Sequence, residues 1–146
     1  MTGASGTAMV RKVSSGAPWE ESVGYSRAVA AGDYIFVSGC TSVQGGQIVH
    51  DGDPGAQAGQ AIANVEAALA ALGASLADVV RTRMFVTDMS CSAQVGAAHQ
   101  AAFGPVRPAT SMLAVAALID PRLLVEVEAV AYRPAPAPGA GLGWPA

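Results

Sequence analysis

The sequence contains little charge, few aromatic residues and almost no lysine. Charged residues make up 13% of the 146 residues, aromatic residues make up 5%, and Lys12 is the only lysine. The formal net charge is −3 and the arginines are scattered, so nothing in the sequence supports a nucleic-acid partner. Apolar residues, in contrast, make up 51%. A chain with so little polar surface often covers part of its apolar surface in an oligomer.

Residues that bind metal ions are also scarce. The two cysteines, Cys40 and Cys91, have no CxxC spacing, and the two histidines, His50 and His99, lie at ligand spacing neither from each other nor from a cysteine. We therefore expect no metal site and no cofactor, and we interpret the cysteines as reduced thiols.

Long apolar runs are missing as well. No stretch reaches the ~18 apolar residues that a membrane span requires, and residues 1–9 lack the charged-then-apolar order of a signal peptide. We therefore expect a cytoplasmic protein without a membrane partner. The length fits one domain, which we place at residues 1–132, followed by a Pro/Gly/Ala-rich flexible tail at 133–146.

Strand and helix patterns alternate along the predicted domain. Asp53 suits an N-cap and Pro54 the first helical position, and apolar residues then recur at helical spacing until Gly73, which is placed to end the helix. A second helix is predicted at 90–103. The predicted strands are 8–13, 25–30, 34–38, 41–43, 47–49, 79–87, 110–118 and 123–132.

This order predicts an α+β fold with both helices on one face of a sheet. Apolar residues alternate along the last two predicted strands, so a second sheet face left open to solvent would be unfavourable. Burial against identical subunits is the simplest way to cover that face. Glu126 and Glu128, two residues apart on one strand, share a face. Salt bridges to Arg81 or Arg83 and a functional role remain equally open for these glutamates.

Several strings, in this order and spacing, resemble the RidA/YjgF family. They span residues ~20 to 132, and no single one is decisive. The strings are Gly24-Tyr25-Ser26-Arg27-Ala28-Val29, Ile35-Phe36-Val37-Ser38-Gly39, Val79-Val80-Arg81-Thr82-Arg83-Met84-Phe85-Val86-Thr87-Asp88, Arg107-Pro108-Ala109-Thr110-Ser111 and Leu124-Val125-Glu126-Val127-Glu128-Ala129-Val130-Ala131.

The resemblance implies a chorismate-mutase-like fold in a homotrimer, whose sheets form a central barrel with the helices outside and pockets between subunits. It also implies a small-molecule metabolite as partner. The best-known members hydrolyse reactive imine and enamine intermediates derived from amino acids, for example 2-aminoacrylate.

Site residues follow from the resemblance position by position. Tyr25 matches a pocket tyrosine, and Ser38 and Gly39 match a Ser-Gly pair whose backbone completes the pocket. Glu126 matches a glutamate that positions or activates the attacking water, which suits a carboxylate base. Cys40, directly after the pair, is expected close to the pocket.

One position departs from the family pattern. Thr110 stands where the family carries an arginine that grips the substrate carboxylate with two parallel hydrogen bonds. Met112 stands where many members carry cysteine, and Gly96 where a pocket asparagine is common. Arg107 is the candidate substitute, although its odd offset from Thr110 favours a solvent-facing turn residue.

We therefore expect a pocket between subunits that binds or acts on a reactive imine, enamine or related metabolite, with weak or no standard 2-imino acid deaminase activity. Two alternatives stay open: a non-catalytic trimer that binds a metabolite or a partner, and an intact 2-iminobutanoate/2-iminopropanoate deaminase.

Overall fold

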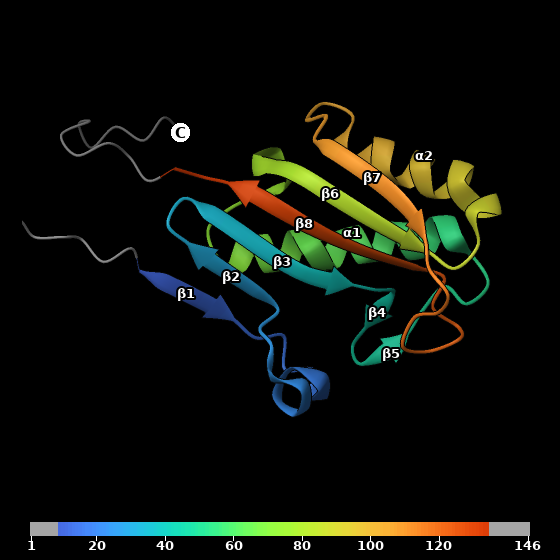
Figure 1. Ribbon diagram of the computed structural model, residues 1–146, viewed down its shortest axis with the longest axis horizontal. Helices are drawn as coiled ribbons and strands as arrows, with labels where there is room; N and C mark the ends of the chain where they lie inside the picture. The colour runs from blue at the N-terminus through green and yellow to red at the C-terminus, as the bar shows by residue number, and fades with distance from the viewer. Residues whose placement is uncertain (1–8, 135–146) are drawn as a thin grey trace, which may run out of the picture.

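A six-stranded sheet is the largest element of the structure, a computed structural model that describes residues 9–134 (Figure 1). Its strand order is β1-β2-β3-β8-β6-β7, and all neighbours are antiparallel except the parallel pair β6 and β7. The strands are β1 Val10–Val13, β2 Ala28–Ala31, β3 Tyr34–Cys40, β6 Val79–Val86, β7 Ala109–Ala114 and β8 Val125–Tyr132. The predicted tail at 133–146 lies outside the described residues from residue 135 onward.

Helix α1, Pro54–Ala71, begins and ends as its sequence predicts. The Asp53 side chain accepts a hydrogen bond from the Ala56 N–H at 3.0 Å, and Pro54 occupies the first turn. Gly73, with φ +79°, supplies the left-handed residue after the helix. The small hairpin of β4, Val43–Gln44, and β5, Gln47–Ile48, precedes this helix as expected.

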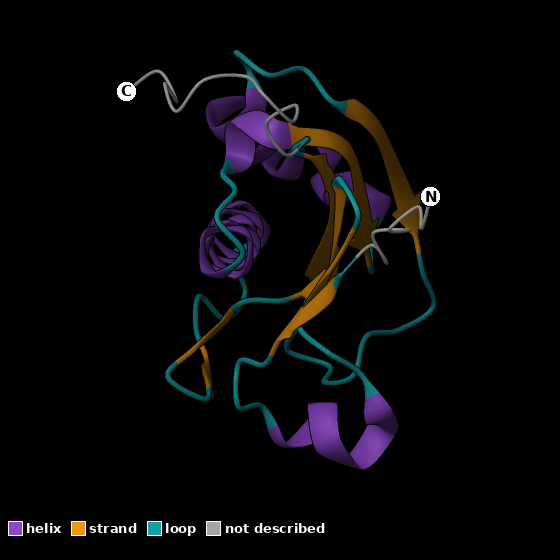
Figure 2. Cartoon of the chain, turned by 90° about the vertical axis from the view of Figure 1, so that its left-hand side faces the viewer, coloured by secondary structure: helices purple, strands orange, loops and turns teal. Residues whose placement is uncertain are grey.

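Helix α2, Ser92–Phe103, packs beside α1, and both lie on the same face of the sheet (Figure 2). Two single 3-10 turns, Leu76–Asp78 and Met89–Cys91, flank β6. The core lies between the helices and the sheet. Its members include Ile35, Val37, Ile62, Val65, Leu69, Met84, Val86, Val95, Phe103, Val125 and Val127. The α+β prediction with both helices on one face is confirmed.

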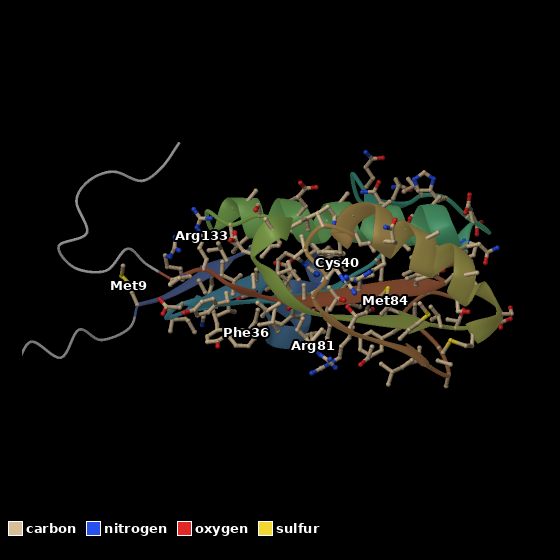
Figure 3. The ribbon with its side chains drawn as sticks, turned by 90° about the horizontal axis from the view of Figure 1, so that it is seen from above. Met9, Phe36, Cys40, Arg81, Met84 and Arg133 are labelled. Atoms are coloured by element: carbon tan, nitrogen blue, oxygen red, sulfur yellow. The ribbon has the colours of Figure 1, made fainter. Side chains whose placement is uncertain are left out.

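Among residues 9–134, no helix packs on the other face of the sheet (Figure 2). Phe36 and Arg81 point away from the helices, whereas Cys40 and Met84 lie on the helix side (Figure 3). Phe36 is 47% exposed, and Tyr34 and Tyr132 beside it are 47% and 42% exposed. We call this surface the open face, and it leaves a row of aromatic side chains in contact with solvent.

A hollow of about 290 Å³ lies on the open face. Apolar side chains line one side of it, including Phe36 and Val130, and charged side chains line the other. Arg83 and Glu128 belong to the charged side and form an ion pair at 2.7 Å. One of the salt bridges considered for the glutamates of β8 is therefore present, and it belongs to Glu128.

Two predicted strands differ from the structure by three residues or more at one end. The strand predicted at 25–30 begins only at Ala28, because a single π-helical turn, η1 Glu20–Gly24, precedes it. The buried Glu20 carboxylate accepts hydrogen bonds from the Ser15 N–H and hydroxyl, which anchors this turn. The strand predicted at 110–118 ends at Ala114, since its partner β6 ends at Val86.

Among residues 9–134, no helix is long and apolar enough to cross a membrane.

Candidate functional site

A β-bulge in β3 separates the two ends of that strand. Val37 pairs with Ala129 and Cys40 pairs with Val127, so β3 has one residue more than β8 between these pairs. The extra residue lies at the Ser38-Gly39 step. Because of it, Cys40 turns back to the helix side and is only 3% exposed. Cys40 is thus a core residue, and its side chain does not lie on the open face.

The bulge brings the Gly39 backbone against the Glu126 carboxyl group. A Cβ on Gly39 would overlap Glu126 Oε1 and would lie 2.6 Å from Cδ. Real Cβ atoms do not approach carboxyl atoms this closely, so only glycine leaves room for the carboxylate here. Gly39 and Glu126, which the resemblance assigns to one pocket, are therefore in direct contact.

Glu126 lies on the open face, opposite Phe85 of β6. Burial raises the pKa of its carboxyl group, the charge of Glu128 raises it further, and the nearby Arg27 guanidinium lowers it. In the part of the chain that the structure describes, no side chain donates a hydrogen bond to Glu126. A half-buried carboxylate with a raised pKa and free lone pairs can accept a proton from water.

Arg27 is a site residue that the sequence reading did not single out. Its Nη1 donates to the Gly39 carbonyl oxygen at 2.6 Å and to the Ser38 carbonyl oxygen at 3.3 Å. Its Nη2 donates to the Tyr25 hydroxyl at 3.3 Å, and its Nε lies 3.8 Å from Glu20 Oε2. One guanidinium thus contacts the backbone of the bulge, the Tyr25 hydroxyl and the carboxylate of Glu20 in the helical turn.

The position of Arg27 could have been noticed from its spacing. Tyr25 and Arg27 are two residues apart, which places both side chains on one side of an extended chain. An arginine directly before an apolar strand needs a partner or solvent. In the structure the Arg27 side chain is only 14% exposed and its Cζ lies 5.6 Å from the centre of the Tyr25 ring.

The Tyr25 ring lies beside this guanidinium. Tyr25 is the residue directly after η1 rather than part of a strand, which corrects its predicted placement. Ser38 has a different role, because its hydroxyl donates to the Ser26 carbonyl oxygen at 2.7 Å. The Ser38 hydroxyl therefore ties the bulge to the segment that precedes β2.

Thr110 lies in a second cluster, on the edge strand β7. Its hydroxyl oxygen is 2.8 Å from that of Thr82, which is fully buried and in turn lies 2.8 Å from His99 Nε2. His99 belongs to α2, so these three side chains lie on the helix side of the sheet. Met112 faces the same side and packs against the core.

Arg107 lies in the turn that leads into β7. Its backbone has φ +55°, an uncommon value for a residue other than glycine, and its N–H donates to the Phe103 carbonyl oxygen at 2.8 Å. Its side chain is exposed and makes no hydrogen bond or ion pair with residues 9–134. The structure therefore does not bring Arg107 to Thr110 within one chain, and its predicted role stays a prediction.

The predicted site residues thus form two groups on opposite faces of one sheet. Glu126 lies at the open face in contact with Gly39, and Thr110 and Met112 lie at the helix side of the edge strand. A single copy of the sheet stands between them. Among the described residues, no group of three His, Cys, Asp or Glu side chains is placed to hold a metal ion.

Replacing Arg27 tests its electrostatic effect on Glu126. In Arg27→Gln the guanidinium no longer lowers the pKa of the Glu126 carboxyl group, so that pKa rises further. As the pH is lowered, a reaction that requires ionised Glu126 then begins to slow at a higher pH than in the wild type. The acid limb of the pH–rate profile therefore moves to higher pH. Arg27→Lys keeps the charge and moves the limb less. An unchanged limb in both variants contradicts the proximity of these charges.

The chain is similar to known proteins along most of its length. The family model described as Endoribonuclease L-PSP matches residues 17–133. An uncharacterised protein of Streptomyces coelicolor is 44% identical over 124 residues, 85% of this chain and 92% of that protein. The Escherichia coli 2-iminobutanoate/2-iminopropanoate deaminase is 35% identical over 112 residues, 75% of this chain and 87% of the deaminase.

Solved structures match as well. A Mycobacterium tuberculosis protein of the YjgF family has a TM-score of 0.79 and 50% identity, over 85% of this chain and 99% of that one. The Escherichia coli YjgF gene product has a TM-score of 0.69 and 35% identity, over 75% and 87% of the two chains. The fold is therefore the chorismate-mutase-like fold of these proteins, and the chain belongs to the RidA/YjgF family.

Proposed function

We propose that this protein binds a small imine or enamine in a pocket between two subunits of a cytoplasmic homotrimer and adds water to it, with Glu126 as the general base. The observation that carries the proposal is the Glu126 carboxyl group, which lies against the Gly39 backbone with a raised pKa and no hydrogen-bond donor among the described residues. We propose further that hydrolysis of 2-imino acids is slow, because Thr110 replaces the arginine of the family pattern.

The chemistry needs a base for the attacking water, a proton for the imine nitrogen and a way to exclude bulk water. Glu126 takes a proton from a water molecule as the oxygen attacks the imine carbon, and then passes this proton to the imine nitrogen, whose π bond to carbon has broken. The hydroxyl proton of the resulting amino alcohol then moves through Glu126 to the amino nitrogen, the carbon–nitrogen bond breaks, and ammonia and a carbonyl compound are released. In this proposal the Tyr25 hydroxyl, which Arg27 Nη2 contacts at 3.3 Å, orients the substrate.

The opposite faces of the two groups support a pocket between subunits. Glu126 can meet Thr110 only if a second copy presents its edge strand to the first, since one sheet separates them within a chain. The open face also carries exposed Tyr34, Phe36 and Tyr132, which a neighbouring copy would cover. A homotrimer satisfies both requirements, in agreement with the resemblance.

Thr110 limits the expected activity. A hydroxyl supplies one neutral donor, whereas a guanidinium supplies two donors and a charge to a carboxylate. The Escherichia coli relative is named as a deaminase, and for this chain we propose only a weak activity on the same substrates. The family model's description as an endoribonuclease gains no support from the net charge of −3.

A coupled assay tests this proposal. A serine dehydratase generates 2-aminoacrylate and 2-iminopropanoate, and semicarbazide traps the imine that remains. We expect a small acceleration of imine loss with the wild type and a rate at least about tenfold higher with Thr110→Arg, because the second donor and the charge return. Thr110→Val is the matched control and gains nothing.

The alternatives give different results in the same assay. A wild type as fast as the Escherichia coli enzyme points to an intact deaminase, with Arg107 as its carboxylate anchor if Arg107→Gln removes the rate. A protein that binds product-like ketones but accelerates nothing, even as Thr110→Arg, is a non-catalytic metabolite-binding trimer. Either result rejects the proposal as stated.

A further inference from the structure

A chain of hydrogen bonds ends at the Thr110 hydroxyl. His99 Nε2 lies 2.8 Å from the Thr82 hydroxyl oxygen, which lies 2.8 Å from the Thr110 hydroxyl oxygen. Thr110 in turn donates to the Pro108 carbonyl oxygen at 3.0 Å. The first two groups lie in or near the core, with Thr82 fully buried, while Thr110 is exposed on the edge strand. The chain therefore connects a half-buried histidine to a hydroxyl at the surface.

The number of protons fixes the direction of this chain. Each threonine hydroxyl has one proton, and a carbonyl oxygen has none to give. Thr110 donates its only hydroxyl proton to the Pro108 carbonyl oxygen, so Thr82 must be the donor in the hydrogen bond between the two threonines. The only proton of Thr82 is then used, and His99 must be the donor to it, which places the histidine proton on Nε2.

His99 is held in this role by its surroundings. Its ring stacks on Phe103 with centroids 4.7 Å apart, and burial lowers its pKa, so the ring is neutral at neutral pH. At neutral pH His99 therefore contributes a hydrogen bond to these threonines and no positive charge. Thr110 receives a hydrogen bond from Thr82, so its own proton is available to a different acceptor, which in this structure is the Pro108 carbonyl oxygen.

We propose that His99 and Thr82 are positioning residues that hold Thr110 as a single, uncharged hydrogen-bond donor, so that the site takes a ligand with a neutral carbonyl-type oxygen at this position in preference to a carboxylate. A ligand oxygen replaces the Pro108 carbonyl as acceptor when Thr110 rotates. This inference rests on the proposed function for the presence of Thr110 in the pocket, and it names the class of ligand.

The first test needs no ligand and no variant of the cluster. Nitrogen-15 NMR of the labelled protein identifies which imidazole nitrogen carries the proton, and His50→Gln assigns the signals because the chain has only two histidines. We expect the Nε2–H tautomer for His99 at neutral pH. An Nδ1–H tautomer would reverse the chain and overturn the proposal, whether or not the protein hydrolyses imines.

The second test compares two ketones that differ in one group. We expect 2-oxobutanamide to bind at least as tightly as 2-oxobutanoate in calorimetric titrations. His99→Phe keeps the ring contact with Phe103 but donates nothing, and should weaken amide binding by about tenfold. His99→Gln places an amide N–H at the position of Nε2 and should stay within about threefold of the wild type.

The outcomes separate this inference from the proposed function. A wild type that prefers the carboxylate overturns the inference, as does unchanged amide binding in His99→Phe. If no imine is hydrolysed but the amide preference and its loss in His99→Phe are found, the inference stands and the catalytic proposal fails. If neither ketone binds, the ligand class is wrong, and only the tautomer result still supports the positioning of Thr110.

Discussion

Glu126→Gln is expected to reduce imine hydrolysis to the level of the uncatalysed reaction. A positioned general base contributes about 10²- to 10⁴-fold to such rates, and the amide cannot accept the proton of the attacking water. The substitution keeps the size of the side chain and its contact with Gly39. The semicarbazide assay measures the loss, and activity retained within about tenfold of the wild type would exclude Glu126 as the base.

Glu128→Gln is the matched control, because both glutamates lie on β8 and share the open face. Glu128 pairs with Arg83, and the two side chains are 32% and 50% exposed, so loss of the pair changes stability by less than about 1 kcal/mol. Its charge also helps to raise the pKa of the Glu126 carboxyl group. Activity should therefore remain, with the acid limb of the pH–rate profile moved to lower pH.

Glu126→Gln should also make the protein more stable at neutral pH. Its pKa is raised in the folded state, so the folded chain binds this proton more readily than the unfolded chain. The stability that the protonated carboxyl group contributes is complete below the unfolded pKa and is lost as pH rises through the folded pKa. Glu126→Gln should thus raise the melting temperature at pH 7 and have little effect at pH 4.

Gly39→Ala is expected to remove activity as well, for a steric reason. The new methyl group would overlap Glu126 Oε1, so the carboxylate or the bulge must move. A displacement of about 1 Å at a catalytic group can cost about 100-fold in rate. Crowding of this kind costs about 1–3 kcal/mol of stability. Imine turnover and chemical denaturation measure the two effects.

Gly59→Ala is the matched substitution that should not harm the protein. Gly59 lies on the exposed side of α1, and a Cβ there meets no atom within 4 Å. Alanine favours the helix over glycine, so we expect a gain of about 0.5–1 kcal/mol and unchanged turnover. Equal activity in both alanine variants would contradict the contact between Gly39 and Glu126.

Much of the fold could be predicted because local sequence signals agree with the packing. Asp53, Pro54 and Gly73 mark α1 by capping chemistry alone. The turn at Glu20–Gly24 could not be predicted in this way, because it depends on the burial of Glu20 against the Ser15 backbone. The early end of β7 likewise depends on where its neighbour β6 ends.

The candidate site could be predicted only in part. Gly39 and Glu126 were assigned by resemblance, and the structure brings them into contact. The spacing of Arg27 from Tyr25 indicates a shared side of the chain, but its partners could not be predicted, because they include backbone carbonyls of a bulge. The placement of Thr110 and Glu126 on opposite faces could be derived only once the register of β7, β6 and β8 was known. It follows from the alternation of side chains along these paired strands.

The central claim is that the pocket needs a second copy of the chain, and the mass of the wild-type protein in solution tests it most directly. Light scattering coupled to size-exclusion chromatography should return about 44 kDa, the mass of three chains of 14.6 kDa, at micromolar concentration and neutral pH. A mass near 15 kDa would leave Thr110 and Glu126 on opposite faces of a lone sheet, and would contradict the shared pocket.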